Sequence, residues 1–157
     1  MGLVSHGLYV ISDNFFNDYV GLGDFEYNKN NSRPHYFAFK DKDGVFWMVP
    51  MSSQVGHYRR KIEKIKKQKK ECIYYEIGVI ANKEVVFLIS KSFPIIPRYI
   101  HHAYTIDHVH YIVKDKNLVK SLTNKIKRYI LLIEQGKIKS DDIDVLKLKK
   151  VLAEKDL

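Results

Sequence analysis

The chain has 157 residues, and 45% of them are apolar, so we expect one folded domain over residues 1–157 and exclude a disordered tail. The 27 Lys and Arg residues outnumber the 18 Asp and Glu residues, and the net charge of +9 favours an anionic partner. The one cysteine, Cys72, excludes a disulfide framework and a cysteine-based zinc finger, and no apolar run approaches the roughly 18 residues that span a bilayer.

The first part of the chain alternates short apolar runs with turn residues, a pattern that predicts antiparallel strands. The expected strands are residues 7–11, 34–39, 45–49, 73–80 and 84–89. A turn at 41–44 joins the second strand to the third, and Asn82-Lys83 joins the last two. Ser12 or Asp13 is expected to cap a short helix that ends at Tyr19, and residues 21–32 read as a loop.

The last part of the chain predicts helices. An amphipathic helix is expected at 120–134. Before it lie an apolar crossing segment over 93–97 and a stretch over 101–113 whose pattern fits either a helix or a strand. The apolar face of the helix at 120–134 comprises Leu122, Ile126, Tyr129, Ile130 and Ile133. Ser140, Asp141 and Asp142 are expected to cap a final helix through Leu152. These elements together predict a mixed α+β domain.

Most of the positive charge is concentrated in residues 58–70, where eight Lys and Arg side chains accompany one Glu. The segment lacks Gly and Pro, so we expect a helix from near Ser52-Ser53 to near Lys70. Tyr58, Ile62 and Ile65 form one narrow docking stripe. The crowding of like charges favours a polyanion site over a solvated face, and the narrow stripe favours nucleic acid over a membrane surface.

A cluster of polar residues adjoins the start of this helix. Pro50 is expected to end the preceding strand, so Ser52 and Ser53 are placed as N-cap residues beside unpaired backbone N–H groups. Such a helix start binds anions, and His57 lies about one turn further on. Arg33 precedes the antiparallel neighbour strand and is expected to return to the same end.

These residue types suit the cleavage of RNA by its own 2′-hydroxyl. That reaction needs a base, an acid and donors that stabilise negative charge on phosphorus. His57 can transfer a proton near neutral pH, Arg33 can grip a phosphate through two donors, and Ser53 can hydrogen-bond a phosphate oxygen or the 2′-hydroxyl. No metal or cofactor is required. Simple capping, surface exposure and ion pairing are the alternative roles of these residues.

Other chemistry finds less support in the sequence. His101, His102, His108 and His110 invite a metal site, but zinc needs further ligands that no Cys pair or HExxH motif supplies, so we expect none. Phe37, Phe39 and Trp47 are expected in the core, with RNA stacking as the alternative. No Walker loop, GxGxxG or GxSxG motif is present.

An ordered set of motifs resembles the ToxN/AbiQ superfamily, the endoribonuclease toxins of type III toxin–antitoxin systems, especially its CptN-like and TenpN-like branches. The set comprises Arg33-Pro34-His35-Tyr36-Phe37, the turn at Gly44, Val45-Phe46-Trp47-Met48-Val49, Pro50-Met51-Ser52-Ser53, the Lys-rich helix, and Lys91-Ser92-Phe93-Pro94-Ile95-Ile96-Pro97. Length and element order match over nearly the whole chain.

The resemblance implies a highly twisted antiparallel sheet with flanking helices, distantly like the MazF/Kid toxins. It implies metal-independent cleavage of RNA that leaves a 2′,3′-cyclic phosphate and a 5′-hydroxyl. It also implies that the protein processes, and is inhibited by, repeat-derived pseudoknot RNAs in closed protein–RNA assemblies within the bacterial cytoplasm.

By position, the resemblance assigns catalytic roles to Ser53, its neighbour Ser52 and Arg33. Relatives often place lysine just after the serines, whereas Gln54, Val55 and Gly56 stand here, so His57 or Arg33 is expected to share that work. The expected RNA contacts are Lys29, His35, Arg59, Arg60, Lys61, Lys64, Lys66, Lys67, Lys69 and Lys70.

Two alternatives stay open on the sequence alone. One is a non-catalytic, basic RNA-binding domain, which needs the charged helix but no reactive serine. The other is a DNA-binding regulator, which needs base-reading residues that a helix of phosphate contacts does not offer, so DNA is not expected as a partner.

Overall fold

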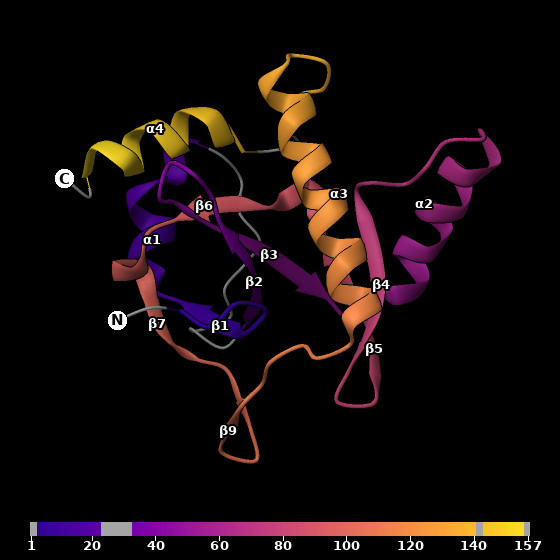
Figure 1. Cartoon of the computed structure of the whole chain (residues 1–157), viewed down its shortest axis with the longest axis horizontal. Coiled ribbons are helices and arrows are strands. Elements are labelled where there is room, and N and C mark those ends of the chain that lie inside the picture. The colour runs from indigo at the N-terminus through magenta and orange to yellow at the C-terminus, as the bar shows by residue number, and fades with distance from the viewer. Residues whose placement is uncertain (1–2, 23–32, 141–142, 156–157) are drawn as a thin grey trace.

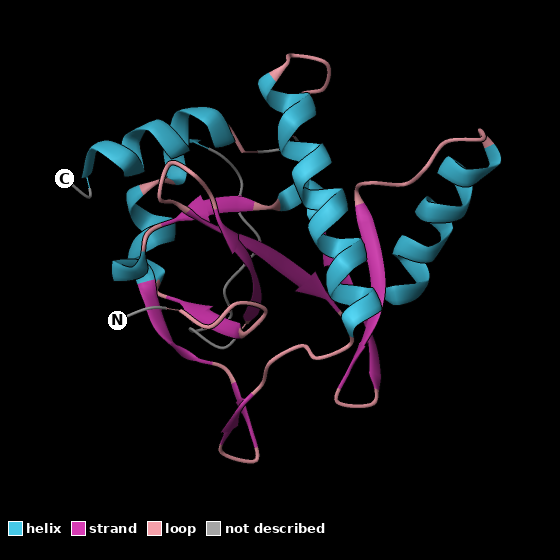
Figure 2. Cartoon of the chain, in the orientation of Figure 1, coloured by secondary structure: helices cyan, strands magenta, loops and turns pink. Residues whose placement is uncertain are grey.

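Seven of the short strands in the described ranges pair into one antiparallel sheet, which the helices cover (Figures 1 and 2). The structure is a computed structural model that describes residues 3–22, 33–140 and 143–155. Within these ranges the chain is an α+β domain with a seven-stranded sheet and four α-helices, which confirms the predicted class. Lys29 and the predicted cap residues Asp141 and Asp142 lie outside the described residues. The likeness to MazF/Kid stays a prediction.

Strands that are consecutive along the chain make half of the pairings in the sheet, and strands distant in sequence make the other half. The strands are β1 (Leu8–Ile11), β2 (Pro34–Lys40), β3 (Phe46–Ser52), β4 (Tyr75–Ile80), β5 (Lys83–Leu88), β6 (Phe93–Ile95), β7 (Ile100–Ala103), β8 (Thr105–Ile106) and β9 (Val109–His110). The sheet order is β4-β5-β3-β2-β1-β7, β6 pairs with β3, and β8 and β9 form a separate hairpin. The α-helices are α1 (Asp13–Asp18), α2 (Val55–Lys67), α3 (Lys116–Glu134) and α4 (Val145–Lys155).

The predicted β2–β3 hairpin is confirmed, and Asp41 organises its turn. One carboxylate oxygen of Asp41 accepts hydrogen bonds from the backbone N–H groups of Asp43 and Val45. The other accepts from Nε1 of Trp47 at 2.9 Å, and Gly44 takes the left-handed conformation with φ of 86°. Trp47 is fully buried, in agreement with its expected core position.

Pro50 does not end β3, because the strand continues to Ser52. On the β2 side Pro50 lies opposite His35. On the other side of β3, pairing with β6 stops at Met48 and pairing with β5 begins at Met51. Proline lacks an N–H, and it stands where the partner strand changes, so no ladder hydrogen bond is lost on that side.

Helices α2 and α3 lie on opposite faces of the edge strand β4. Tyr75 of β4 meets the ring of Tyr58 from α2, with 4.9 Å between centroids. The next side chain, Glu76, instead accepts a hydrogen bond from Lys125 of α3 at 3.1 Å. Since successive side chains of a strand alternate between faces, the two helices sandwich this edge of the sheet (Figure 1).

Helix α3 buries the five apolar residues that its periodicity predicted. Its start at Lys116 comes four residues earlier than expected, because Asp115 caps it by accepting hydrogen bonds from the N–H groups of Asn117 and Leu118. The cap of α1 is also confirmed, since Ser12 Oγ accepts from the N–H of Asn14. No helix within the described ranges is both long and apolar enough to traverse a bilayer.

The structure resolves two segments that the sequence left undefined and moves two predicted boundaries. The apolar segment at 93–97 contains strand β6, and the ambiguous stretch at 101–113 forms strands rather than a helix. The turn between β4 and β5 is Ala81-Asn82, one residue earlier than expected, and both residues have positive φ as a two-residue hairpin turn requires. Helix α4 continues to Lys155 instead of ending at Leu152.

We expect the Gly78→Ala substitution to lower the free energy of unfolding by about 1–3 kcal/mol, because it overpacks a tight contact. A Cβ atom at Gly78 would lie 2.6 Å from Cδ2 of Leu118 and 3.0 Å from Cε1 of Phe87. Gly56→Ala is the matched control: only Arg60 lies near, at 3.8 Å, so alanine in helix α2 should stabilise the protein by up to about 1 kcal/mol. Urea unfolding of both variants measures the difference, and equal effects would contradict the packing argument.

Candidate functional site

The junction between β3 and α2 presents one serine that holds the backbone and one that is open. Ser52 ends β3 opposite Val86, and its Oγ accepts a hydrogen bond from the N–H of Gln54 at 3.1 Å. The Ser53 side chain is exposed and makes no hydrogen bond within the described part of the chain. The helix begins at Val55 with Gln54 as its N-cap, so the expectation that the serines cap the helix is wrong.

The first turn of α2 leaves backbone donors open. The N–H of Tyr58 reaches the carbonyl of Gln54, whereas those of Gly56 and His57 have no acceptor among the residues described. Arg60 lies beside this turn, since its Nη1 is 3.8 Å from the point that a Cβ atom at Gly56 would occupy. Open N–H groups, the helix dipole and a guanidinium group together favour an anion at this point.

The strand pairing carries Arg33 toward the same point. His35 lies opposite Pro50 and Tyr36 opposite Val49, so continuing this register by two residues brings Arg33 level with Ser52. Arg33 is half-buried just before β2. The antiparallel register therefore carries the backbone of Arg33 to the serine end of β3, as the sequence predicted.

His57 lies in the first turn of α2 with an exposed side chain. Its ring meets the ring of Tyr58 edge-on, at 4.9 Å between centroids. It makes no hydrogen bond with Ser53, so the described residues show no preassembled pair of hydroxyl and base. The exposed ring is nevertheless open to a substrate that binds at the helix start.

His35 does not fit its expected role as an RNA contact, because its side chain is 0% exposed. Its ring packs near Phe16 and Phe93, at 6.2 and 5.7 Å between centroids. Nδ1 donates to the carbonyl of Arg33 at 3.3 Å, and Nε2 has no partner among the residues that the structure describes. Burial lowers the pKa of His35 to about 3, although the hydrogen bond to Arg33 opposes that shift.

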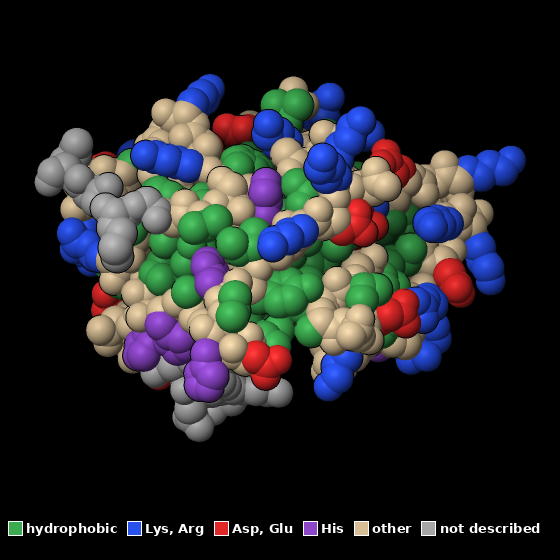
Figure 3. All heavy atoms as spheres, turned by 60° about the horizontal axis from the view of Figure 1, so that its bottom comes forward, with side chains coloured by type: hydrophobic (Ala, Val, Ile, Leu, Met, Phe, Trp, Pro, Cys, Tyr) green, Lys and Arg blue, Asp and Glu red, His purple; other side chains and the backbone are tan. Residues whose placement is uncertain are grey.

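The basic helix docks through the predicted stripe, since Tyr58, Ile62 and Ile65 are its half-buried apolar side chains. It ends at Lys67, so Lys69 and Lys70 follow the helix, and Lys69 has a positive φ of 57°. All of the predicted cationic contacts from Arg59 to Lys70 are exposed. Figure 3 shows Lys and Arg side chains projecting around the end of the molecule that α2 forms, with fewer acidic ones between them.

Two of these cations already have protein partners. Arg59 forms an ion pair with Glu84 at 2.7 Å. Lys61 Nζ lies 5.3 Å from the ring centroid of Tyr58 and 5.7 Å from that of Tyr75, so it bridges α2 and β4. Tyr75 was not predicted as part of the site. Tyr58 and Lys61 are three residues apart, so the sequence already predicted that they share one face of the helix, but it did not predict that Tyr75 joins them.

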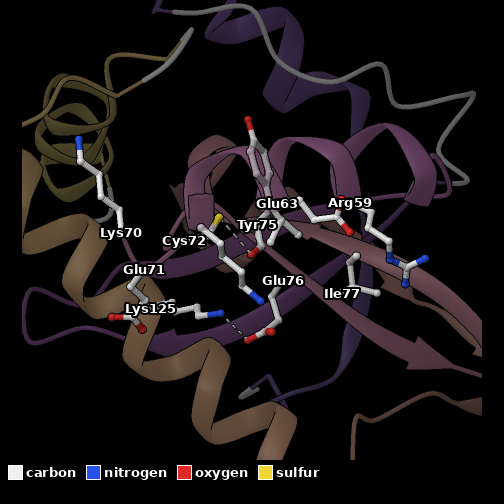
Figure 4. Close-up of a pocket in the computed structure, with 11 residues that line it drawn as sticks. Arg59, Glu63, Lys70, Glu71, Cys72, Tyr75, Glu76, Ile77 and Lys125 are labelled. Atoms are coloured by element: carbon white, nitrogen blue, oxygen red, sulfur yellow. Dashed lines mark hydrogen bonds and ion pairs between the residues drawn. The ribbon is translucent and has the colours of Figure 1, made fainter. Parts of the chain in front are cut away.

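A cavity of about 370 Å³ lies between α2, β4 and α3 (Figure 4). Its cationic residues are Arg59, Lys66, Lys70 and Lys125, and its acidic residues are Glu63, Glu71 and Glu76. Figure 4 shows Lys125 directed at Glu76 across the cavity. Cations and carboxylates nearly balance here, so the cavity is a less favourable phosphate site than the outer surface of α2.

The histidines of the chain do not assemble into a metal centre within the described ranges, which contain no group of three or more potential ligands. His101 and His102 form a pair, with 2.6 Å between their Nδ1 atoms. His108 is in the β8–β9 turn with φ of 65°, and Nε2 of His110 donates to the carbonyl of Leu8.

No protein-family model matches this chain, and no curated protein matches it significantly.

Proposed function

We propose that this protein is a metal-independent endoribonuclease of the ToxN/AbiQ type that cuts RNA at the junction of β3 and α2. The observation that carries the proposal is the exposed Ser53 hydroxyl next to a helix start with open N–H groups and a strongly cationic surface. A phosphodiester in this position would meet both donors and positive charge. The 2′-hydroxyl of the substrate supplies the nucleophile, so the protein need not.

In the proposed reaction the 2′-oxygen attacks phosphorus and the bond to the 5′-oxygen breaks. The 2′-hydroxyl loses a proton and the leaving 5′-oxygen gains one; His57 makes one of these two transfers and the solvent makes the other, so no water is consumed. Arg33 and Ser53 hold the phosphate oxygens, and Ser52 fixes the backbone turn that presents Ser53. The products are a 2′,3′-cyclic phosphate and a 5′-hydroxyl, and atoms balance without water or metal.

The proposal includes regulation by RNA. The processed product of a repetitive precursor would occupy the cationic surface of α2 as a pseudoknot antitoxin and would exclude cellular RNA substrates, in a closed assembly of protein and RNA. A short tandem repeat followed by a terminator just upstream of the coding sequence would support this part, and its absence would contradict it.

A second candidate is a non-catalytic RNA-binding domain. The observation that favours it is that Ser53 and His57 make no hydrogen bond with each other. In that case Ser53 is a surface residue and its removal has no consequence.

The experiment that separates the two candidates is incubation of the purified protein with RNA in EDTA, followed by chemical mapping of the new ends. We expect cleavage, with 2′,3′-cyclic phosphate and 5′-hydroxyl ends. A requirement for a divalent metal, or 5′-phosphate ends, would contradict the proposed chemistry.

The Ser53→Ala variant should cleave about a hundredfold more slowly, because it loses one donor to the developing charge. Its stability should not change, since Ser53 Oγ has no hydrogen bond in the described structure, and its affinity for RNA should stay within about twofold. Ser52→Ala is the matched control and should instead lose about 0.5–1.5 kcal/mol of stability with its bond to Gln54. Single-turnover cleavage and thermal unfolding provide the readouts, and unchanged cleavage by Ser53→Ala would favour the second candidate.

A further inference from the structure

A second cavity, of about 450 Å³, lies at the far end of the β2–β3 hairpin from Ser52 and Ser53. It opens between the hairpin turn, α3 and Lys149 of α4. Its volume is within the range of about 300–1,000 Å³ that ligand pockets have. Strand β3 has seven residues, so roughly 20 Å separates this cavity from the serines.

The floor of the cavity is apolar and partly open to solvent. Phe39, Ile130 and Leu131 line it. Leu131 is 51% exposed, although leucine side chains are ordinarily buried. Lys127 Nζ lies 5.5 Å from the ring centroid of Phe39, so a cation already covers part of that ring. A flat aromatic ligand can stack on this ring once the Lys127 ammonium moves from the ring face to the edge of the ligand.

The rim of the cavity carries charged side chains of both signs. Lys149 is neutralised by Asp41 and Asp43, at 3.0 and 2.6 Å. Both carboxylate oxygens of Asp41 already accept hydrogen bonds, from Trp47 and from the turn backbone, so Asp41 stabilises the hairpin turn and is not available to a ligand.

Two further lysines of the rim, Lys42 and Lys127, make no ion pair with any described residue, whereas Nζ of Lys40 lies 5.4 Å from the ring centroid of Phe46, outside the cavity. Glu134 also lines the cavity, and its carboxylate has no partner in the described ranges. The cavity thus combines an apolar floor, two lysines without ion pairs and one open hydrogen-bond acceptor.

We infer that this cavity binds one base of a single-stranded RNA segment, with the base stacked on Phe39 and Leu131 and its flanking phosphates near Lys42 and Lys127. Base stacking and backbone cations are the two components of single-strand recognition. Glu134 accepts a hydrogen bond from an amino group, which adenine, cytosine and guanine carry and uracil lacks. The inference rests on the proposed function, and it adds a base-binding subsite remote from the scissile phosphate.

The test uses the full-length protein and an RNA that it cannot cleave. A fluorescent 2′-O-methyl oligonucleotide of ten adenosines lacks the attacking hydroxyl, so binding is measured by anisotropy without turnover. The comparison probe is an abasic oligonucleotide of the same length, which carries the same phosphates but no bases. We expect the wild-type protein to bind the adenosine probe at least fivefold more tightly than the abasic one.

The decisive variant is Leu131→Glu, which places a carboxylate on the exposed floor of the cavity. Its control is Leu146→Glu on α4, where the leucine is similarly exposed, at 41%, and lies outside the cavity. Leu131→Glu should abolish the preference for bases, and Leu146→Glu should keep it. Glu134→Gln should reduce the preference for ten adenosines over ten uridines.

The outcomes separate this inference from the proposed function. Equal affinity of the wild-type protein for both probes, or equal behaviour of the two leucine variants, overturns the base subsite alone and leaves RNA cleavage untouched. A wild-type protein that binds no probe at all overturns the RNA-directed function together with the subsite.

Discussion

A variant with four lysines of the α2 segment replaced by glutamine is expected to bind RNA about a hundredfold or more weakly at roughly 0.15 M salt. Each lysine that neutralises a phosphate releases a counterion, which gives a salt slope of about −0.7 per contact on single strands. Losing four contacts should therefore make the slope of log affinity against log salt shallower by about three. The four positions, all exposed and without protein partners within the described ranges, are Lys64, Lys66, Lys67 and Lys69.

The control must change the net charge equally. Four exposed lysines elsewhere serve this purpose, namely Lys114, Lys116, Lys120 and Lys150, each replaced by glutamine. If the effect comes from the α2 surface, this second variant should lose less than about fivefold in affinity and keep most of its salt slope. Lys61 is left intact in both variants, because its contacts with Tyr58 and Tyr75 hold α2 to β4. Equal salt slopes in the two variants would show that the whole molecule, rather than α2, attracts the RNA.

The sequence predicted those parts of the fold where one local pattern dominates. The face of α3 follows from a 3.6-residue period, and the β2–β3 hairpin follows from alternation interrupted by a turn at Gly44. Pro50 was placed at a strand end because proline removes a ladder donor, but at this position the partner strand changes from β6 to β5. That exchange depends on the sheet order, which no local pattern contains.

The candidate site was predicted less completely than the fold, for the same reason. Helix α2 starts at Val55 because the chain needs Ser53 and Gln54 to turn out of β3, so the N-cap preference of serine did not decide the boundary. His35 was expected to contact RNA, whereas α1 covers its ring through Phe16. The second cavity brings together residues that are about 90 positions apart, and only tertiary structure joins them.

The buried His35 leads to the other large effect: the free energy of unfolding should fall as the solution is acidified from pH 7 toward pH 4.5. Burial lowers the pKa of His35 in the folded protein to about 3, against 6.5 as the ordinary value. Below pH 6.5 the His35 side chain is therefore protonated in the unfolded chain but stays neutral in the folded protein. Stability is complete above pH 6.5 and is lost as the pH falls toward 3, at up to about 1.4 kcal/mol per pH unit.

Other groups with shifted pKa values act in neighbouring ranges. Burial would raise the pKa of Asp41, but its hydrogen bonds from Trp47 and Lys149 outweigh burial and lower it, so Asp41 loses its contribution only below its ordinary value of 3.8. Burial lowers the pKa of His6, which adds in the same direction as His35 from a shallower site. The interval from pH 6.5 to 4.5 therefore reports chiefly on His35.

The test is urea unfolding at several pH values for His35→Asn, with His57→Asn as the control at an exposed histidine. Asparagine does not titrate, and its amide nitrogen can replace Nδ1 as the donor to the carbonyl of Arg33. We expect the wild-type protein to lose about 2–3 kcal/mol between pH 6.5 and 4.5. His35→Asn should lose less than half of that, and His57→Asn should follow the wild type. The same pH dependence in all three proteins would mean that His35 reaches solvent, and with it a proton, in the native state.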